Sequence, residues 1–558
     1  MSTPRWLAFT FAIAFGFTVQ AADSPLSQIS NEADVVIRIR AFDTTVQNIA
    51  ALANAVQPGA GDMVSQNATL FGPIVSNPAL SGVDRTKDFY LVLFMREEGE
   101  PKALFAIPTT DGPALQKALP ENFESQVRED WVFYADKDHG VPPAVSAAES
   151  LATLMAKSVS ANEVFEKSDV GLHINVSHIA DIYNAQILEA RLKFEEGIQK
   201  GLNTPGVENA ESVVEILKLG ADMAFKLLED TETFTIGVNA SESGLVIEDY
   251  IDFQESSDIA AFLKKQPKSK FTALTKLGAG LPLYMGISAE FAELAQATEK
   301  FTALLYKDEA VRQGMKDYIG AMKTLQITSA VMSFDLASGT KGMLRTTGVF
   351  ETKKAAELLA TGRKFATLSK SITVGEMTQE TTLVPDAETV GTHKIDLMTI
   401  TQKVDPNQPG AATQAMITGL MFGAKGMQTR MTALADGYLQ VQGGDKDTMG
   451  AAIKAYEAKS NSLTEARAGM ADESHLLMLL DLPGLVRNGM LAATTINIPG
   501  FAIPFQRAAV EDLQISPSYT AVTAVGEEHA VRIKTKVPVE QFQGVLKLVG
   551  FAQSIHGR

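Results

Sequence analysis

The sequence contains no cysteine. That absence excludes disulfide bonds, iron–sulfur clusters, thiolate zinc sites, a cysteine nucleophile and the lipidated N-terminal cysteine of a bacterial lipoprotein. Basic side chains are also scarce, since 49 Lys plus Arg stand against 66 Asp plus Glu, a formal net charge of −17. Nucleic acid and anionic bilayers would repel such a chain, so general binding to either is not expected.

Long apolar runs are missing after the first two dozen residues. The best later candidate, residues 415–424, holds about ten residues, whereas a membrane span needs roughly 20. The composition, 45% hydrophobic and 21% charged, is typical of a folded globular protein and excludes a disordered or polytopic membrane chain. A length of 558 residues predicts more than one domain.

Residues 1–21 have the pattern of a secretory signal peptide. Arg5 is the single charge before Asp23, an apolar run covers residues 6–19, and Ala21 closes a small-residue cleavage site. The apolar run is shorter than the roughly 20 residues of a membrane span, so we expect cleavage after Ala21. The mature protein is then exported to a bacterial periplasm or beyond, where a cysteine-free chain cannot form stray disulfides.

One local pattern recurs four times, starting near residues 34, 169, 282 and 475. A strand leads into a helix, and later a hairpin with a polar, glycine-containing turn leads into another helix. In the first copy, residues 34–41 (DVVIRIRA) alternate with period 2, which indicates a half-buried strand. The pattern predicts an α+β fold of antiparallel sheets with helices packed on one face.

A two-fold internal duplication fits the irregular spacing of these copies. An aromatic strand and an Asp-Lys-Asp turn follow the first copy at residues 131–138 and the third at residues 438–447. The sequence predicts four segments: a signal peptide over 1–21, a first α+β half over 22–265, a linker over 266–280 and a second α+β half over 281–558. The alternative is that strings of strands, hairpins and helices resemble one another by chance.

No pattern for catalysis, cofactor binding or metal binding is present. The zinc-protease pattern H-E-x-x-H, the nucleophile pattern G-x-S-x-G and the P-loop are all missing. His173 and His178 come closest to a metal pair, but a site needs a third ligand. Since His173 lies on the polar side of its strand, we interpret both as surface histidines. The sequence therefore predicts no catalytic residue, no cofactor and no metal.

Methionine is frequent between residues 416 and 431. If this segment is helical, Met416, Leu420, Met427 and Met431 lie on one face together with Gly423. Because methionine packs adaptably, that face is a candidate site for an apolar ligand or a protein partner. The alternative is a core helix beneath a sheet.

Two expected strands begin with glycine after a polar turn, at residues 243–247 (SGLVI) and 341–344 (KGML). In this feature and in its layout, the chain resembles large exported bacterial proteins of unknown function that are built from repeated strand–helix–hairpin–helix units. The resemblance implies an exported α+β protein and transfers no catalytic residue.

These observations favour an exported, soluble, non-enzymatic protein with a binding or structural role. One alternative is a carrier that holds an apolar ligand, such as a lipid, between sheet and helices. The other is an enzyme, for example a hydrolase, of unrecognised type. The partner would be a protein or an apolar small molecule.

Overall fold

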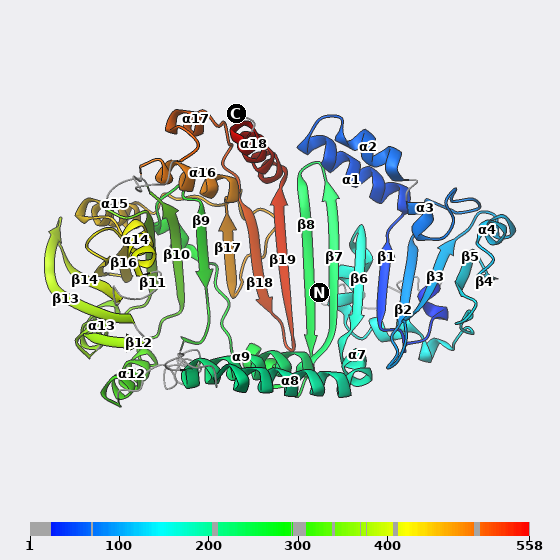
Figure 1. Ribbon diagram of the computed structural model, residues 1–558, viewed down its shortest axis with the longest axis horizontal. Helices are drawn as coiled ribbons and strands as arrows, with labels where there is room; N and C mark the ends of the chain where they lie inside the picture. The colour runs from blue at the N-terminus through cyan, green and yellow to red at the C-terminus, as the bar shows by residue number, and fades with distance from the viewer. Residues whose placement is uncertain are drawn as a thin grey trace, which may run out of the picture.

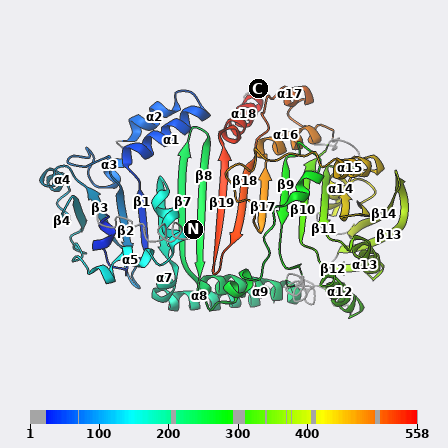
Figure 2. The same cartoon turned by 180° about the vertical axis from the view of Figure 1, so that it is seen from behind.

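The computed structural model describes residues 24–68, 71–202, 210–291, 293, 309–337, 341–368, 370–374, 377–404, 411–495 and 503–556. The signal peptide expected over residues 1–21 lies outside these ranges. Every described strand joins one antiparallel sheet, which is drawn in Figure 1 and from behind in Figure 2. The expected α+β class is confirmed, with a single sheet in place of several.

The sheet runs from β4 at one edge to β12 at the other. The strands, in the order in which they pair, are β4 (Phe123–Arg128), β5 (Trp131–Asp136), β3 (Lys102–Pro108), β2 (Phe89–Phe94), β1 (Val35–Ile39), β6 (Val170–Asn175), β7 (Thr231–Ser241), β8 (Gly244–Phe253), β19 (Ala530–Pro538), β18 (Thr520–Gly526), β17 (Leu476–Leu480), β9 (Leu283–Ile287), β10 (Ser329–Leu336), β11 (Leu344–Glu351), β16 (Gly437–Gln442), β15 (Met427–Leu434), β14 (His393–Val404), β13 (Met377–Val390) and β12 (Ser371–Val374).

Strands from the two parts of the chain form two contiguous blocks. The order β4-β5-β3-β2-β1-β6-β7-β8 recurs as β15-β16-β11-β10-β9-β17-β18-β19, and the blocks meet where β8 pairs with β19. This is the order that an internal duplication predicts, and the duplication itself stays a hypothesis. The hairpin β13–β14 and strand β12 extend the second block without a counterpart among the described strands of the first.

Helices lie along both ends of the strands, as both views show. At one end lie α1 (Phe42–Val56), α2 (Ala60–Asn67), α16 (Leu482–Ala493), α17 (Arg507–Glu511) and α18 (Val539–His556), and at the other end lie α7 (Val176–Ile182), α8 (Asn184–Leu202) and α9 (Ala210–Asp230). The remaining named helices are α3 (Phe71–Ile74), α4 (Gly112–Ala118), α5 (Leu151–Met155), α6 (Val159–Lys167), α10 (Asp258–Leu263), α12 (Glu309–Met322), α13 (Ala355–Leu368), α14 (Ala411–Phe422) and α15 (Lys446–Ala458). Within the described ranges, no helix combines the length and the apolar character needed to span a bilayer.

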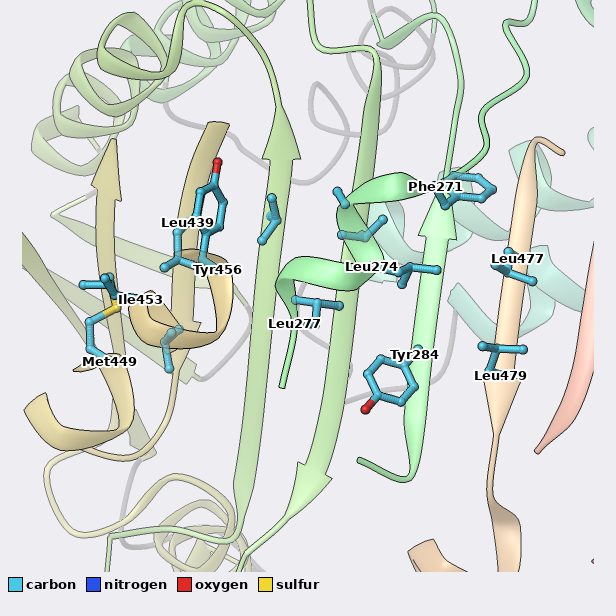
Figure 3. Close-up of a cluster of buried hydrophobic side chains, with 14 of the residues drawn as sticks. Phe271, Leu274, Leu277, Tyr284, Leu439, Met449, Ile453, Tyr456, Leu477 and Leu479 are labelled. Carbon is cyan, nitrogen blue, oxygen red and sulfur yellow. The ribbon is translucent and has the colours of Figure 1, made fainter. Parts of the chain in front are cut away.

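We call the face of the sheet that carries Val36 of β1 the covered face. On this face α6 packs over β6 and β7, and the short 3₁₀ helix η5 (Thr272–Lys276) packs over β9. Figure 3 shows the largest core cluster there, in which Phe271 and Leu274 meet Leu477 of β17 and side chains of α15. The opposite face, which carries Ile37 and Ile39 of β1, is called the open face.

The predicted linker is only partly a surface connection. Residues 264–270 are exposed or half-buried. Phe271, Leu274 and Leu277, however, are 1%, 3% and 1% exposed. These three large apolar side chains recur every third residue, so η5 turns all of them into the core. The chain between residues 271 and 277 is therefore part of the core of the second half, and the division into two domains stays a prediction.

Candidate functional site

The four residues expected to form one helical face do not share a helix. Met416 and Leu420 lie in α14, whereas Met427 and Met431 lie in β15. Gly423, directly after the helix, has a φ of 84°, a left-handed value that glycine tolerates, and the chain reverses there. Met431 is 7% exposed in a core cluster, while Met416 is 39% exposed. The prediction that these four residues form a single helical face is therefore wrong.

A different apolar site begins where β1 turns into α1. Ala41 has a φ of 35°, and its backbone N–H donates to Oδ1 of Asp88 at 2.8 Å. The guanidinium of Arg38 donates to the same carboxylate at 2.7 Å and to backbone carbonyl groups of α6 at 2.8 and 3.0 Å. These bonds hold Arg38 on the covered face, so Ile39 faces the other way, beneath Phe42.

Helix α1 forms one wall of this site. Its apolar side chains recur at helical spacing and form one face: they are Phe42, Val46, Ile49 and Ala53. Helix α2 is held against α1 by the backbone N–H of Gly61, which donates to Oδ1 of Asn54 at 2.8 Å. As Figure 1 shows, α1 lies across the ends of β1, β6 and β7.

Between these helices and the sheet lies a pocket of about 640 Å³. Its lining, from α1, α2, α3, β1 and the start of β6, is predominantly aliphatic: Ile39, Phe42, Thr45, Val46, Ile49, Ala53, Ala60, Met63, Val64, Asn67, Ala68, Ile74 and Val170. A smaller cavity of about 200 Å³ over β1, β2 and β3 shares Ile39 and Ile74 with it and has an entirely apolar lining except for Tyr90. A volume of 640 Å³ falls within the range of roughly 300–1,000 Å³ that small-molecule sites occupy.

The pocket offers very little polar chemistry. Thr45 and Asn67 are the only polar residues among its described lining, and none of its lining residues is ionisable. The Thr45 hydroxyl is engaged with the backbone carbonyl groups of Arg40 and Asp169. A ligand here would be bound by removing hydrocarbon from water, at roughly 25 cal/mol per Å².

One of the two histidines, His173, does not lie on the surface as expected. His173 is buried, at 4% exposed, on the covered face, with Nδ1 at 2.8 Å from Oγ1 of Thr235. Burial lowers the pKa of His173 to about 4, so the ring is neutral near pH 7. His178 is half-exposed and its Nδ1 lies 2.6 Å from Oδ1 of Asp34. In the part of the chain that the structure describes, no three His, Asp or Glu side chains gather as metal ligands.

A second large cavity, of about 680 Å³, lies between η5 and residues 459–472. Its lining is polar, but several of its polar groups bond the backbone. Arg467 donates to the carbonyl of Lys270 at 2.9 Å, and Asn461 donates to the carbonyl of Leu274 at 3.4 Å. These bonds fasten the loop to η5, so these polar groups of the cavity have a structural role.

Sequence reasoning missed the pocket residues, although a signal for them exists. The spacing of Phe42, Val46, Ile49 and Ala53 marks an apolar helical face, and Met63 and Val64 lie in the next helix, α2. The same spacing is found in any helix that packs on a core. What distinguishes the pocket is that Met63 is 64% exposed and Ile74 is 61% exposed.

Comparison with known proteins assigns no family. The chain matches no protein-family profile and no curated protein. A solved structure, crystal form III of TP0453, is similar at 10% sequence identity over 49% of this chain and 97% of that chain, with a TM-score of 0.21. A likeness this weak carries no argument about fold or function.

Proposed function

We propose that this chain is an exported, non-enzymatic carrier that holds a hydrocarbon chain between the sheet and helices α1 to α3. The observation that supports the proposal is the pocket of about 640 Å³ with its aliphatic lining. Exposed apolar side chains in one patch typically mark a ligand or partner site. Met63 and Ile74 are such side chains, because both line the pocket and more than half of each is exposed.

The aliphatic pocket favours a carrier over the other two functions that the sequence leaves open. A purely structural role gives no reason for an open aliphatic pocket. An enzyme needs a nucleophile, a base and a donor that converge. The described lining of the pocket supplies one engaged threonine hydroxyl and one asparagine amide, so acid–base chemistry has no support there.

Solvent extraction of the purified mature chain is the first test. We expect the extract to contain fatty acids or lipids, identified by mass spectrometry. The delipidated chain should then bind 11-(dansylamino)undecanoic acid, with the rise in emission that the probe shows when it leaves water. An empty extract together with an unchanged probe spectrum would refute the carrier.

A pair of substitutions on α1 places the ligand. Ala53 lines the pocket, whereas Ala51 on the same helix is exposed and is not part of the lining. Ala53→Phe should fill the pocket and weaken probe binding at least about tenfold, equivalent to about 1.4 kcal/mol. Ala51→Phe should leave the affinity within about twofold. Equal affinities for the two variants would show that the probe binds elsewhere.

A further inference from the structure

The pocket opens onto a surface that continues across the sheet. Ile39 and Val170 line the pocket. Ile39 pairs with Val170, Val170 pairs with Val238 of β7, and Val238 pairs with Ile247 of β8. Because directly paired residues of antiparallel strands point to the same face, these side chains form one aliphatic row. Each of them is only half-buried.

The row continues into the second block of strands. Ile247 pairs with Thr535 of β19, which pairs with Val522 of β18. Beyond Val522 the row is Met478, Met285 and Met332, on β17, β9 and β10. Met332 is 37% exposed and the others are half-buried. We call the open-face side chains from β1 to β10 the apolar floor.

A parallel row shows that the floor is wider than one line of side chains. Ile37 pairs with Leu172, which pairs with Ile236. The row then passes through Asp249 of β8 to Ile533 of β19. Apart from the carboxylate of Asp249, these side chains are aliphatic and all of them are half-buried.

The floor is long enough for more than one hydrocarbon chain. From β1 through β6, β7, β8, β19, β18, β17 and β9 to β10 there are eight steps between paired strands. At about 4.8 Å per step the floor extends about 38 Å. The hydrocarbon core of a bilayer, spanned by two acyl chains end to end, is about 30 Å thick.

The chemistry of the floor favours hydrocarbon over polypeptide. Its strands are hydrogen-bonded to neighbours on both sides, so they have no free backbone edge to which an added strand could pair. An extended peptide on the floor would bury N–H and C=O groups opposite aliphatic side chains, at a cost of several kcal/mol for each unpaired group. An acyl chain has no such groups.

We propose that the ligand is a lipid with at least two acyl chains, one in the pocket and one on the apolar floor across the junction of β8 and β19. This inference rests on the proposed function and deepens it by naming the ligand class. The pairing of β8 with β19 would then make one continuous binding surface, because the ligand lies against strands from both blocks. At the far end of the floor, Gly489 of α16 packs against Leu336 of β10 on the open face, so this helix bounds the floor there.

The test uses tryptophan as a reporter on the floor. The variants Ile247→Trp and Val522→Trp place an indole on either side of the junction, and Val384→Trp places one on β13, outside the floor, at a site that is 47% exposed. Trp131, the tryptophan that lies outside the expected signal peptide, is 6% exposed in β5 and supplies a constant background. Phosphatidylcholine with brominated acyl chains quenches indoles that its chains touch.

Added to delipidated protein, brominated phosphatidylcholine should quench Ile247→Trp and Val522→Trp and leave Val384→Trp unchanged. Quenching of Val384→Trp to the same extent would show non-specific adsorption. An indole at 247 that is already blue-shifted and does not respond to lipid would show that protein, such as a partner helix, covers the floor. Either result overturns the inference.

A second measurement separates this inference from the proposed function. Ile247→Asn should weaken binding of a nitrobenzoxadiazole-labelled phosphatidylcholine about tenfold. The affinity for 11-(dansylamino)undecanoic acid should change by no more than about twofold. Val384→Asn is the matched control and should change neither affinity. If only the dansyl probe binds, the pocket stands and the two-chain ligand is wrong. If neither probe binds, both proposals fail.

Discussion

The two faces of the central strands differ in a way that reverses the usual order of polarity. On the covered face, one row of paired residues passes from Arg38 through Gly171 and Gly237 to Glu248 and Lys534. The neighbouring row on the open face consists almost entirely of isoleucine, leucine and valine. Yet α6 and η5 pack on the polar, glycine-containing face. The aliphatic face, which α1 and α16 reach at its margins, stays half-exposed at the central strands.

The covering elements approach where side chains are missing. A Cβ built on Gly237 would stand 2.1 Å from Oγ of Ser168, just after α6, and one on Gly286 would stand 2.6 Å from the ring of Phe271. The open face at β1, β6, β7 and β8 carries branched side chains, which keep a helix backbone at side-chain distance. The comparison teaches that glycine lets α6 and η5 approach the covered face closely. The half-exposed aliphatic face is the one on which we propose that a ligand lies.

The largest expected effect follows from filling one of the glycine contacts. Gly237→Val should destabilise the fold by about 3 kcal/mol, because α6 must move away from β7. Gly220→Val on α9, where a Cβ would meet nothing within 4 Å, is the control. It should leave the stability within about 0.5 kcal/mol or raise it slightly, because valine is a somewhat better helix former than glycine. Urea unfolding followed by circular dichroism measures both. A Gly237→Val protein as stable as the control would show that the close contact does not hold α6.

Two adjacent leucines of β17 compare the faces directly. Leu477 points to the covered face and is 1% exposed, whereas Leu476 points to the open face and is half-buried. Leu477→Ala should cost about 3 kcal/mol, since it leaves a cavity in the core shown in Figure 3. Leu476→Ala should cost about 1 kcal/mol in the lipid-free protein. Equal losses would mean that the open face is an ordinary core.

The strands could be predicted because their signals are local. The strands expected near residues 34, 170, 283 and 475 are present as β1, β6, β9 and β17, and each later hairpin pairs as expected. Period-2 alternation and glycine-containing turns depend only on neighbouring residues. The single sheet was not predictable, because the pairing of β8 with β19 joins residues far apart in sequence.

The candidate site was not predicted, because alternation identifies two faces without saying which is covered. In β1 the usual assignment places Ile37 and Ile39 in the core and Arg38 in water. In the structure Arg38 is instead 4% exposed, and both isoleucines are half-buried. His173 was misplaced for the same reason, since the polar side of β6 is the covered one. The methionine face failed because the helix expected up to residue 431 stops before Gly423.

A smaller effect is expected from the ion pair of the covered face. Nζ of Lys534 lies 2.8 Å from a carboxylate oxygen of Glu248, and both side chains are partly exposed, at 30% and 21%. A double-mutant cycle with Glu248→Gln and Lys534→Met should give a coupling energy of about 0.5 kcal/mol. The coupling should shrink in 1 M salt. A coupling of several kcal/mol would mean that this part of the face is far drier than its exposure indicates.

The smallest expected effect concerns the one carboxylate of the apolar floor. Asp249 pairs with Ile236 on one side and Ile533 on the other, and burial raises its pKa above the ordinary value of 3.8. The folded protein therefore holds this proton more tightly than the unfolded chain. Stability is greatest below pH 3.8 as far as this group is concerned, and it falls as pH rises through the raised pKa.

Asp249→Asn removes that dependence, because the amide stays neutral. The variant should be more stable than the original chain at pH 7, and the difference should shrink as the pH is lowered to about 3.8. Free energies of unfolding measured between pH 3.5 and 7 test this, with Glu97→Gln in the exposed turn after β2 as the control. Bound lipid that covers Asp249 should enlarge the gain at pH 7, since it desolvates the carboxylate further. A variant less stable at pH 7, or a gain that lipid does not change, would place Asp249 in water rather than on the floor beneath a ligand.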